Sequence, residues 1–188
     1  MKISSTTPHV DAHFHIFETG KAIQGARYVP AYAAALDEWW SLASTVGVTH
    51  GVLVQPSFLG TDNRLMVQGL AKHPGRLMGI AVVEPTITLD ELTEMHSLGV
   101  RGVRLNLVGG DHRLDPWCDH SFFWDRLISL GWHVEIHTDP GRLPDVLPKI
   151  PSDLRVVVDH MAKPLKVRVS DPTLQTLRHY GPNRDRKS

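Results

Sequence analysis

The sequence predicts an α/β protein in which parallel strands alternate with helices. Short apolar runs rich in β-branched residues are each followed by a loop and then by a segment with the apolar spacing of a helix. Glycines stand where three of these helices would end, at Gly47, Gly99 and Gly131. Because such alternation implies parallel strands joined by right-handed crossovers, it predicts either a doubly wound sheet or a (β/α)8 barrel.

Six runs are predicted strands, and they are too few to close an eight-stranded barrel. The chain, at 188 residues, is also shorter than the usual barrel of about 200 residues or more. We therefore expect a barrel of about six βα units in one domain over residues 1–180, followed by a polar tail at 181–188. The predicted strands are 10–17, 51–57, 77–85, 102–107, 133–138 and 155–160. The predicted helices are 31–46, 63–73, 89–98, 122–130 and 143–147, with another around 174–180.

Composition limits the classes of partner. Twenty Lys and Arg balance twenty Asp and Glu, which disfavours nucleic acid or a membrane surface as a partner because both attract a basic excess. The polar start and the lack of a long apolar stretch predict no membrane span, and the cytoplasm is the expected compartment. Cys118 is the only cysteine, which excludes an internal disulfide and a multi-cysteine zinc site.

Two histidines one residue apart are the strongest local signal. His13 and His15 lie in an apolar run, and alternation along a strand would place both imidazoles on one face. Such a pair is suited to hold a metal or a substrate. The alternative is an ordinary amphipathic strand that carries two partly buried histidines.

Polar residues also end other predicted strands, where the active sites of parallel α/β folds are built. Because unpaired buried charge is costly, so many polar residues at strand ends together indicate a site. Besides the first pair, these residues are Gln55, Ser57, Arg104, Asn106, His137 and His160.

These residue types suit hydrolysis or decarboxylation assisted by a divalent ion. Imidazoles hold zinc at about 2 Å, and the ion lowers the pKa of its bound water toward neutrality. A further imidazole can carry protons, and an arginine can hold a substrate carboxylate through two parallel hydrogen bonds.

Five runs in order resemble the amidohydrolase superfamily, and specifically its amidohydrolase-related branch, which contains lactonases. The resemblance covers roughly residues 8 to 175 and implies a distorted (β/α)8 barrel. The runs are Asp11-Ala12-His13-Phe14-His15, Gln55-Pro56-Ser57-Phe58-Leu59-Gly60-Thr61-Asp62-Asn63, Gly99-Val100-Arg101-Gly102-Val103-Arg104-Leu105-Asn106, Glu135-Ile136-His137 and Val158-Asp159-His160.

The resemblance implies a role for each matched residue. His13, His15 and His137 would be the metal ligands, with zinc as the expected ion. A lactonase of this branch works without metal, so the resemblance also allows the ion to be absent. His160 would be the activating histidine, and Arg104 would hold a substrate carboxylate. The remaining substrate-binding residues would be Gln55, Ser57, Asn63 and Asn106.

One departure from the family pattern matters. Family members carry an aspartate in a Gly-Ser-Asp-Trp-Pro-like run at the end of the eighth strand, and this chain has no such run. We therefore expect a C-terminally truncated barrel whose first and sixth strands leave exposed edges open to homo-oligomerisation. Hydrolase activity should be largely lost unless Asp139 or Asp159 replaces the aspartate.

The expected function is hydrolysis of a small carboxylated lactone, or a related cyclic compound, by activated water. The alternatives are non-oxidative decarboxylation, and a truncated relic that binds metal or carboxylate without turnover.

Overall fold

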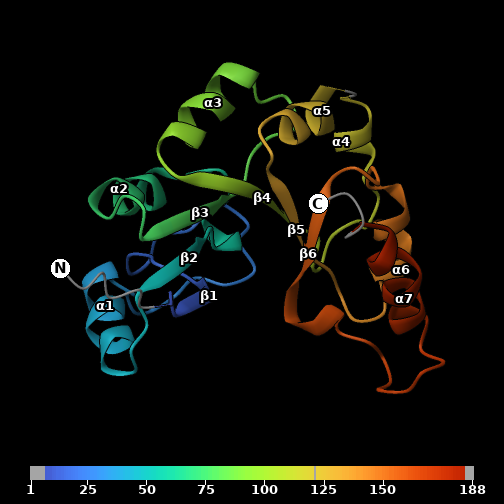
Figure 1. The fold of residues 1–188 in the computed structure, drawn as a ribbon, viewed down its shortest axis with the longest axis horizontal. Helices are drawn as coiled ribbons and strands as arrows, with labels where there is room; N and C mark the ends of the chain where they lie inside the picture. The colour runs from blue at the N-terminus through green and yellow to red at the C-terminus, as the bar shows by residue number, and fades with distance from the viewer. Residues whose placement is uncertain (1–6, 121, 185–188) are drawn as a thin grey trace. The chain divides into compact units, whose positions relative to one another are not determined.

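The fold is described from a computed structural model over residues 7–120 and 122–184 (Figure 1). Contacts divide it into two compact units. The first unit comprises the described residues up to Val82 together with Ser97–Val100, and the second comprises the rest. The strands are β1 (Val10–Phe14), β2 (His50–Val54), β3 (Leu77–Ala81), β4 (Val100–Asn106), β5 (His133–His137) and β6 (Arg155–Val158).

Helices follow the strands as the sequence predicts, so the α/β class and the six predicted strands are confirmed. None of the described helices is long and apolar enough to cross a membrane. The helices are α1 (Leu36–Thr45), α2 (Arg64–Lys72), α3 (Leu89–Ser97), α4 (Asp115–Cys118), α5 (Phe122–Ser129), α6 (Leu143–Val146) and α7 (Pro172–Arg184). Three short 3-10 turns are η1 (Ser57–Leu59), η2 (Leu147–Lys149) and η3 (Asp159–Ala162).

In the first unit, β1 pairs in parallel with β2, and β2 pairs in parallel with β3. The β1–β2 register shifts between Asp11 and Phe14, where three steps along β1 match two steps along β2. One extra residue in a strand is a β-bulge, which turns the neighbouring side chains away from strict alternation. The bulge spans His13, so this side chain is aimed by a local irregularity as well as by the strand.

In the second unit, β4, β5 and β6 pair in parallel in that order. Val103 and Val134 are fully buried register partners, and the next pair along is Arg104 and Glu135. Apolar and charged side chains therefore alternate along the strands, and the charged face is as buried as the apolar one. Helices α6 and α7, orange and red in Figure 1, pack against each other in this unit.

All six predicted strands extend past the observed strand ends, by one residue at β4 and β5 and by two to four at the others. β1 ends at Phe14 and β6 ends at Val158. His15 therefore follows its strand, and His160 lies on the turn η3.

Two helix predictions also needed correction. The helix predicted over 31–46 begins only at Leu36, because Phe17 and Ala34 exchange backbone hydrogen bonds of 3.0 and 2.9 Å in an antiparallel bridge. At the other end, α7 continues to Arg184, four residues into the segment expected to be a tail. Residues 185–188 lie outside the described residues.

Gly51 on β2 is required by packing. A Cβ there would lie 2.6 Å from Phe14 Cε1 and 2.6 Å from Trp39 Cη2, two rings that stack with centroids 3.8 Å apart. We expect Gly51→Ala to lower the free energy of unfolding by about 1–3 kcal/mol, because the stacked rings must move. Urea unfolding measures the loss. The control is Gly110→Ala, whose added Cβ meets nothing closer than 3.6 Å; equal losses in both variants would contradict the packing argument.

Candidate active site

The first unit brings His13 and His15 together. Their Nε2 atoms lie 3.3 Å apart, and the rings meet nearly edge to face at 88°. His15 Nδ1 donates a hydrogen bond of 2.7 Å to the Val54 carbonyl. Because a carbonyl only accepts, this bond puts the proton on Nδ1 and leaves the lone pair of a neutral His15 on Nε2. The Val54 carbonyl therefore sets the tautomer that a metal ligand needs.

The spacing of this pair fits a metal ion. Two nitrogens bound at 2.0–2.1 Å in tetrahedral geometry are about 3.3–3.4 Å apart. The two Nε2 atoms have this separation, and each ring is half-buried. In donor type and spacing, His13 and His15 therefore fit a zinc-like ion.

Three other predicted residues of the first unit lie in or beside the β2–α2 loop, and the side chains of two of them, Gln55 and Asn63, bond to backbone groups. Gln55 is buried, and its Nε2 donates to the carbonyls of Gly60 and Asp62 at 3.2 and 2.8 Å. Asn63 Nδ2 donates to the Val82 carbonyl at 2.8 Å, and its Oδ1 accepts from the Val82 amide at 3.2 Å. Ser57 begins η1. These contacts shape the loop, and the predicted substrate roles of the three residues stay predictions.

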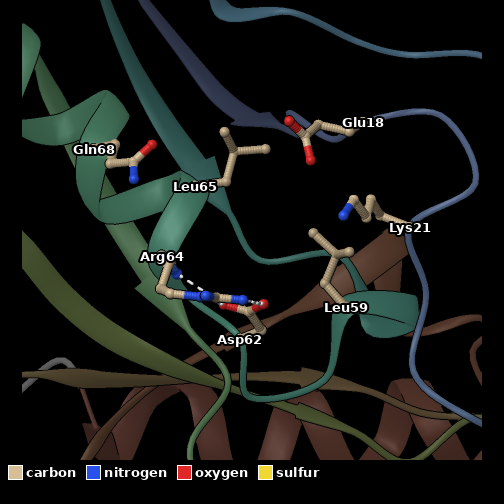
Figure 2. A pocket seen from close by; sticks show the side chains of 7 residues that line it. All are labelled: Glu18, Lys21, Leu59, Asp62, Arg64, Leu65 and Gln68. Carbon is tan, nitrogen blue, oxygen red and sulfur yellow. Dashed lines mark hydrogen bonds and ion pairs between the residues drawn. The ribbon is translucent and has the colours of Figure 1, made fainter.

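A charged pocket of about 290 Å³ opens beside this loop. Figure 2 shows the Asp62–Arg64 ion pair on one side and Glu18 and Lys21 on the other. The Arg64 guanidinium, 2.6 Å from the Asp62 carboxylate, lowers the pKa of that carboxyl to about 2. Two cations and two anions balance, so the walls favour neither sign of ligand charge. None of the predicted site residues lines this pocket.

In the second unit, the buried Arg104 guanidinium faces two carboxylates. Its Nε donates to Asp159 Oδ2 at 2.9 Å, and a second hydrogen bond joins Nη2 to the same oxygen. The same Nε lies 3.0 Å from Glu135 Oε1 as an ion pair. All three side chains are at least 96% buried. Arg104 therefore connects the ends of β4, β5 and β6.

Glu135 titrates abnormally in this cluster. Burial and, next, the negative charge of Asp159 raise its pKa to about 8, and Arg104 only partly offsets both effects. One guanidinium cannot fully compensate two buried carboxylates, so a proton held on Glu135 removes the excess negative charge.

A left-handed turn after β6 carries the other functional groups. Four consecutive residues without a glycine, from His160 to Lys163, have φ between 44° and 61°. This region costs roughly 1–2 kcal/mol for each such residue, and strained backbone of this kind clusters at functional sites. The turn sets the His160 ring 4.6 Å from the His137 ring, centroid to centroid, and Lys163 Nζ 2.8 Å from His137 Nε2.

His137 is held in its neutral form. Burial, followed by the positive charges of Arg104 and Lys163, lowers its pKa to about 3. Because an ammonium only donates, Nε2 of His137 accepts the hydrogen bond from Lys163. The ligand atoms of His137, Asp159 and His160 also lie within 4.8 Å of one another, a donor set that a metal could use. A metal on Nε2 of His137 would replace the bond from Lys163.

Of the predicted residues, the structure joins His13 with His15 in one unit and Arg104, His137 and His160 in the other. Asn106, at the end of β4, is the register partner of His137. No role was predicted for Glu135, and Asp159 was expected only as a possible replacement for the missing aspartate. Glu135 shares the strand face of His137, which is a usable sequence signal, whereas Lys163 reaches the site only through a left-handed turn that the sequence does not predict.

The amidohydrolase family model matches residues 10–180. The chain belongs to the amidohydrolase family. A 2-pyrone-4,6-dicarboxylate hydrolase of Comamonas testosteroni is 35% identical over 161 residues, which are 82% of this chain and 52% of the relative. A 4-sulfomuconolactone hydrolase of Hydrogenophaga intermedia is 27% identical over 179 residues, 89% of this chain and 57% of the relative. The chain therefore spans about half the length of these curated relatives.

A solved structure gives the same family relationship. A probable 2-pyrone-4,6-dicarboxylic acid hydrolase of Acinetobacter baumannii, crystallised with citric acid bound, is 39% identical with a TM-score of 0.82. The match covers 91% of this chain and 65% of that chain. The likeness confirms the predicted fold, with this chain corresponding to part of the longer one.

The raised pKa of Glu135 predicts how stability depends on pH. An unfolded glutamate loses its proton near pH 4.5 and the folded one near pH 8, so stability falls as pH rises through this window. His137 contributes the opposite trend, but only below its unfolded value of 6.5. Between pH 6.5 and 8, Glu135→Gln should therefore remove a decline of up to ~1.4 kcal/mol per pH unit.

Urea unfolding at pH 6.5, 7.2 and 8 measures this slope. Glu84→Gln, a change at an exposed glutamate, is the matched control and should keep the parent slope. A parent slope that survives in Glu135→Gln would show that another group causes the decline.

Proposed function

We propose that this chain forms the catalytic part of a hydrolase that opens a small carboxylated lactone with activated water. The observation that carries the proposal is the His13–His15 pair, whose Nε2 atoms lie 3.3 Å apart with the His15 tautomer set by a backbone carbonyl. The family membership and the two lactone hydrolases among the relatives support the same reaction class.

The proposed metal ligands are His13 and His15 in the first unit and His137 in the second. A divalent ion, zinc in the first instance, supplies a Lewis acid that polarises a carbonyl and acidifies water when it is bound. The low pKa of His137 keeps its imidazole neutral, the form that a ligand needs.

The other groups bind the substrate or move protons. His160 is exposed on its turn beside His137 and is the proposed proton carrier. Arg104 is the proposed partner of a substrate carboxylate, and in the folded chain it already holds Asp159 and Glu135. Lys163 brings a second cation next to His137, so a carboxylate there would meet a positive charge. Gln55, Ser57, Asn63 and Asn106 complete the proposed substrate-binding set.

The test is hydrolysis of 2-pyrone-4,6-dicarboxylate, followed by loss of the ring absorbance and by acid release. With Asp139 or Asp159 in place of the missing aspartate, we expect slow turnover by the parent chain and a further fall of at least about 100-fold in His15→Ala, since loss of an ion or of its orienting shell costs that much or more. The matched control is His179→Ala on α7, which should keep the parent rate.

The same samples distinguish the alternatives. Carbon dioxide release without ring opening would replace hydrolysis with decarboxylation. Binding of zinc or the dicarboxylate without any product would leave a binding remnant. Metal content measured beside activity shows whether the ion is needed: full turnover in metal-free protein would remove the ion from the proposal and keep the hydrolase.

We also propose that copies of the chain associate through the β6 edge in the cytoplasm. Val157 on β6 is 45% exposed, and Met161 and Val167 in the segment after it are 88% and 94% exposed. An exposed strand edge with apolar neighbours is a site for pairing between chains. Sedimentation should show dimers or larger species, and Val157→Lys should shift them toward monomer. A parent chain that is monomeric at high concentration would rule this association out.

A further inference from the structure

His137 lies between two cationic groups of the second unit. Its Nε2 is 2.8 Å from Lys163 Nζ, and its Nδ1 is 3.3 Å from Arg104 Nη2. A neutral imidazole has one lone pair in the ring plane, so it can accept only one of these hydrogen bonds. The shorter contact identifies Lys163 as the donor that uses this lone pair.

A metal ion on His137 would need the same lone pair. The donated hydrogen lies about 1 Å closer to the acceptor than its own nitrogen does, which places it about 1.8 Å from His137 Nε2. Zinc binds an imidazole nitrogen at about 2.0–2.1 Å. The two positions nearly coincide, so His137 Nε2 holds either the ammonium of Lys163 or a metal.

Of the two cations, Lys163 is the one that can leave. Arg104 is buried and is held by the carboxylates of Asp159 and Glu135. Lys163 is half-buried and has a flexible side chain, and its backbone is anchored because its carbonyl accepts a hydrogen bond of 3.0 Å from the Gly141 amide. The ammonium can therefore move away while the turn that carries it stays in place.

The charge of Lys163 is available to a ligand. The partner of Nζ is a neutral ring, which leaves the positive charge uncancelled, whereas Asp159 compensates the charge of Arg104. An ammonium has three N–H donors, and His137 accepts one of them. A carboxylate can therefore bind Lys163 without breaking its contact with His137, and charge-assisted bonds of this kind are strong.

We propose that Lys163 is the resident cation of this site. Its ammonium binds a carboxylate of the ligand while it stays bonded to His137, and a divalent ion reaches His137 only by displacing it. Lys163 thus strengthens the binding of a dicarboxylate and weakens the binding of a metal. The inference rests on the proposed function, in which the substrate carries carboxylates and His137 is a metal ligand.

The first measurement is zinc affinity, by competition with a chromophoric chelator at one fixed pH. Lys163→Met should tighten zinc binding by about tenfold or more, because the ion no longer has to break a charge-assisted hydrogen bond. The matched control is Lys166→Met, the same change at an exposed lysine of the same segment, which should keep the parent affinity.

A second pair of variants separates displacement from a general effect of charge. In a His137→Ala background, Lys163→Met should leave zinc affinity unchanged, because the lone pair for which the two cations compete is gone. An equal gain with and without His137 would mean that Lys163 acts on the metal only through its electric field, and would overturn the displacement.

The carboxylate role is measured in metal-free protein with benzene-1,3-dicarboxylate, a ring that has no lactone to open. Calorimetry should show binding by the parent chain and by Lys166→Met, and binding weaker by about tenfold or more in Lys163→Met. Lys163→Arg keeps the positive charge and should bind the dicarboxylate better than Lys163→Met does.

The two affinities must move in opposite directions in Lys163→Met. Weaker binding of both zinc and the dicarboxylate would indicate a merely structural role and would overturn the proposal, as would no change in either. Pyrone hydrolysis is measured separately. Turnover with unchanged affinities in Lys163→Met would remove this role of Lys163 and keep the hydrolase, and opposite shifts in a chain without turnover would do the reverse.

Discussion

The buried contact of Arg104 with Glu135 and Asp159 is the constraint on which the second unit depends. It joins side chains from β4, from β5 and from the residue after β6, at the strand ends where the other functional groups gather. Removing either Arg104 or Asp159 from such a buried cluster costs about 3–5 kcal/mol, because the charge of the other is left without compensation. Burial lowers the pKa of the neighbouring His137 most, the charge of Arg104 lowers it further, and Asp159 acts in the opposite direction. The Arg104 guanidinium therefore contributes both to the stability of the cluster and to the neutral form of His137.

The two units prepare their histidines by different means. In the first unit a β-bulge and the Val54 carbonyl orient His13 and His15, and the resulting spacing of the nitrogens fits a tetrahedral ion. In the second unit, burial and two cations hold His137 as a neutral acceptor. The first arrangement defines the lone pair of His15, and the second keeps His137 neutral, which binding of a metal or acceptance of a proton requires.

The charged side chains of the second unit also gather outside the Arg104 cluster, in two places that differ in the sign of their charge. Lys163 is directed at His137 by four left-handed residues in a row, a strained arrangement that only the surrounding packing can maintain. The loop after β4 carries mostly anions: Asp111, Asp115 and Asp119 line one pocket, with Arg113 as the one cation of its lining.

The sequence by itself determined the α/β class, the six strands and the polar residues that end them, because apolar periodicity and glycine stops are local signals. Its family resemblance assigned roles to the histidines and to Arg104, and these roles stay predictions. The bulge at His13, the bridge that delays α1 and the turn that delivers Lys163 were decided by tertiary structure. They depend on contacts between residues distant in sequence, such as Phe17 with Ala34 and Lys163 with His137. The pairing of Arg104 with Glu135 and Asp159 needed the strand register, which no single segment encodes.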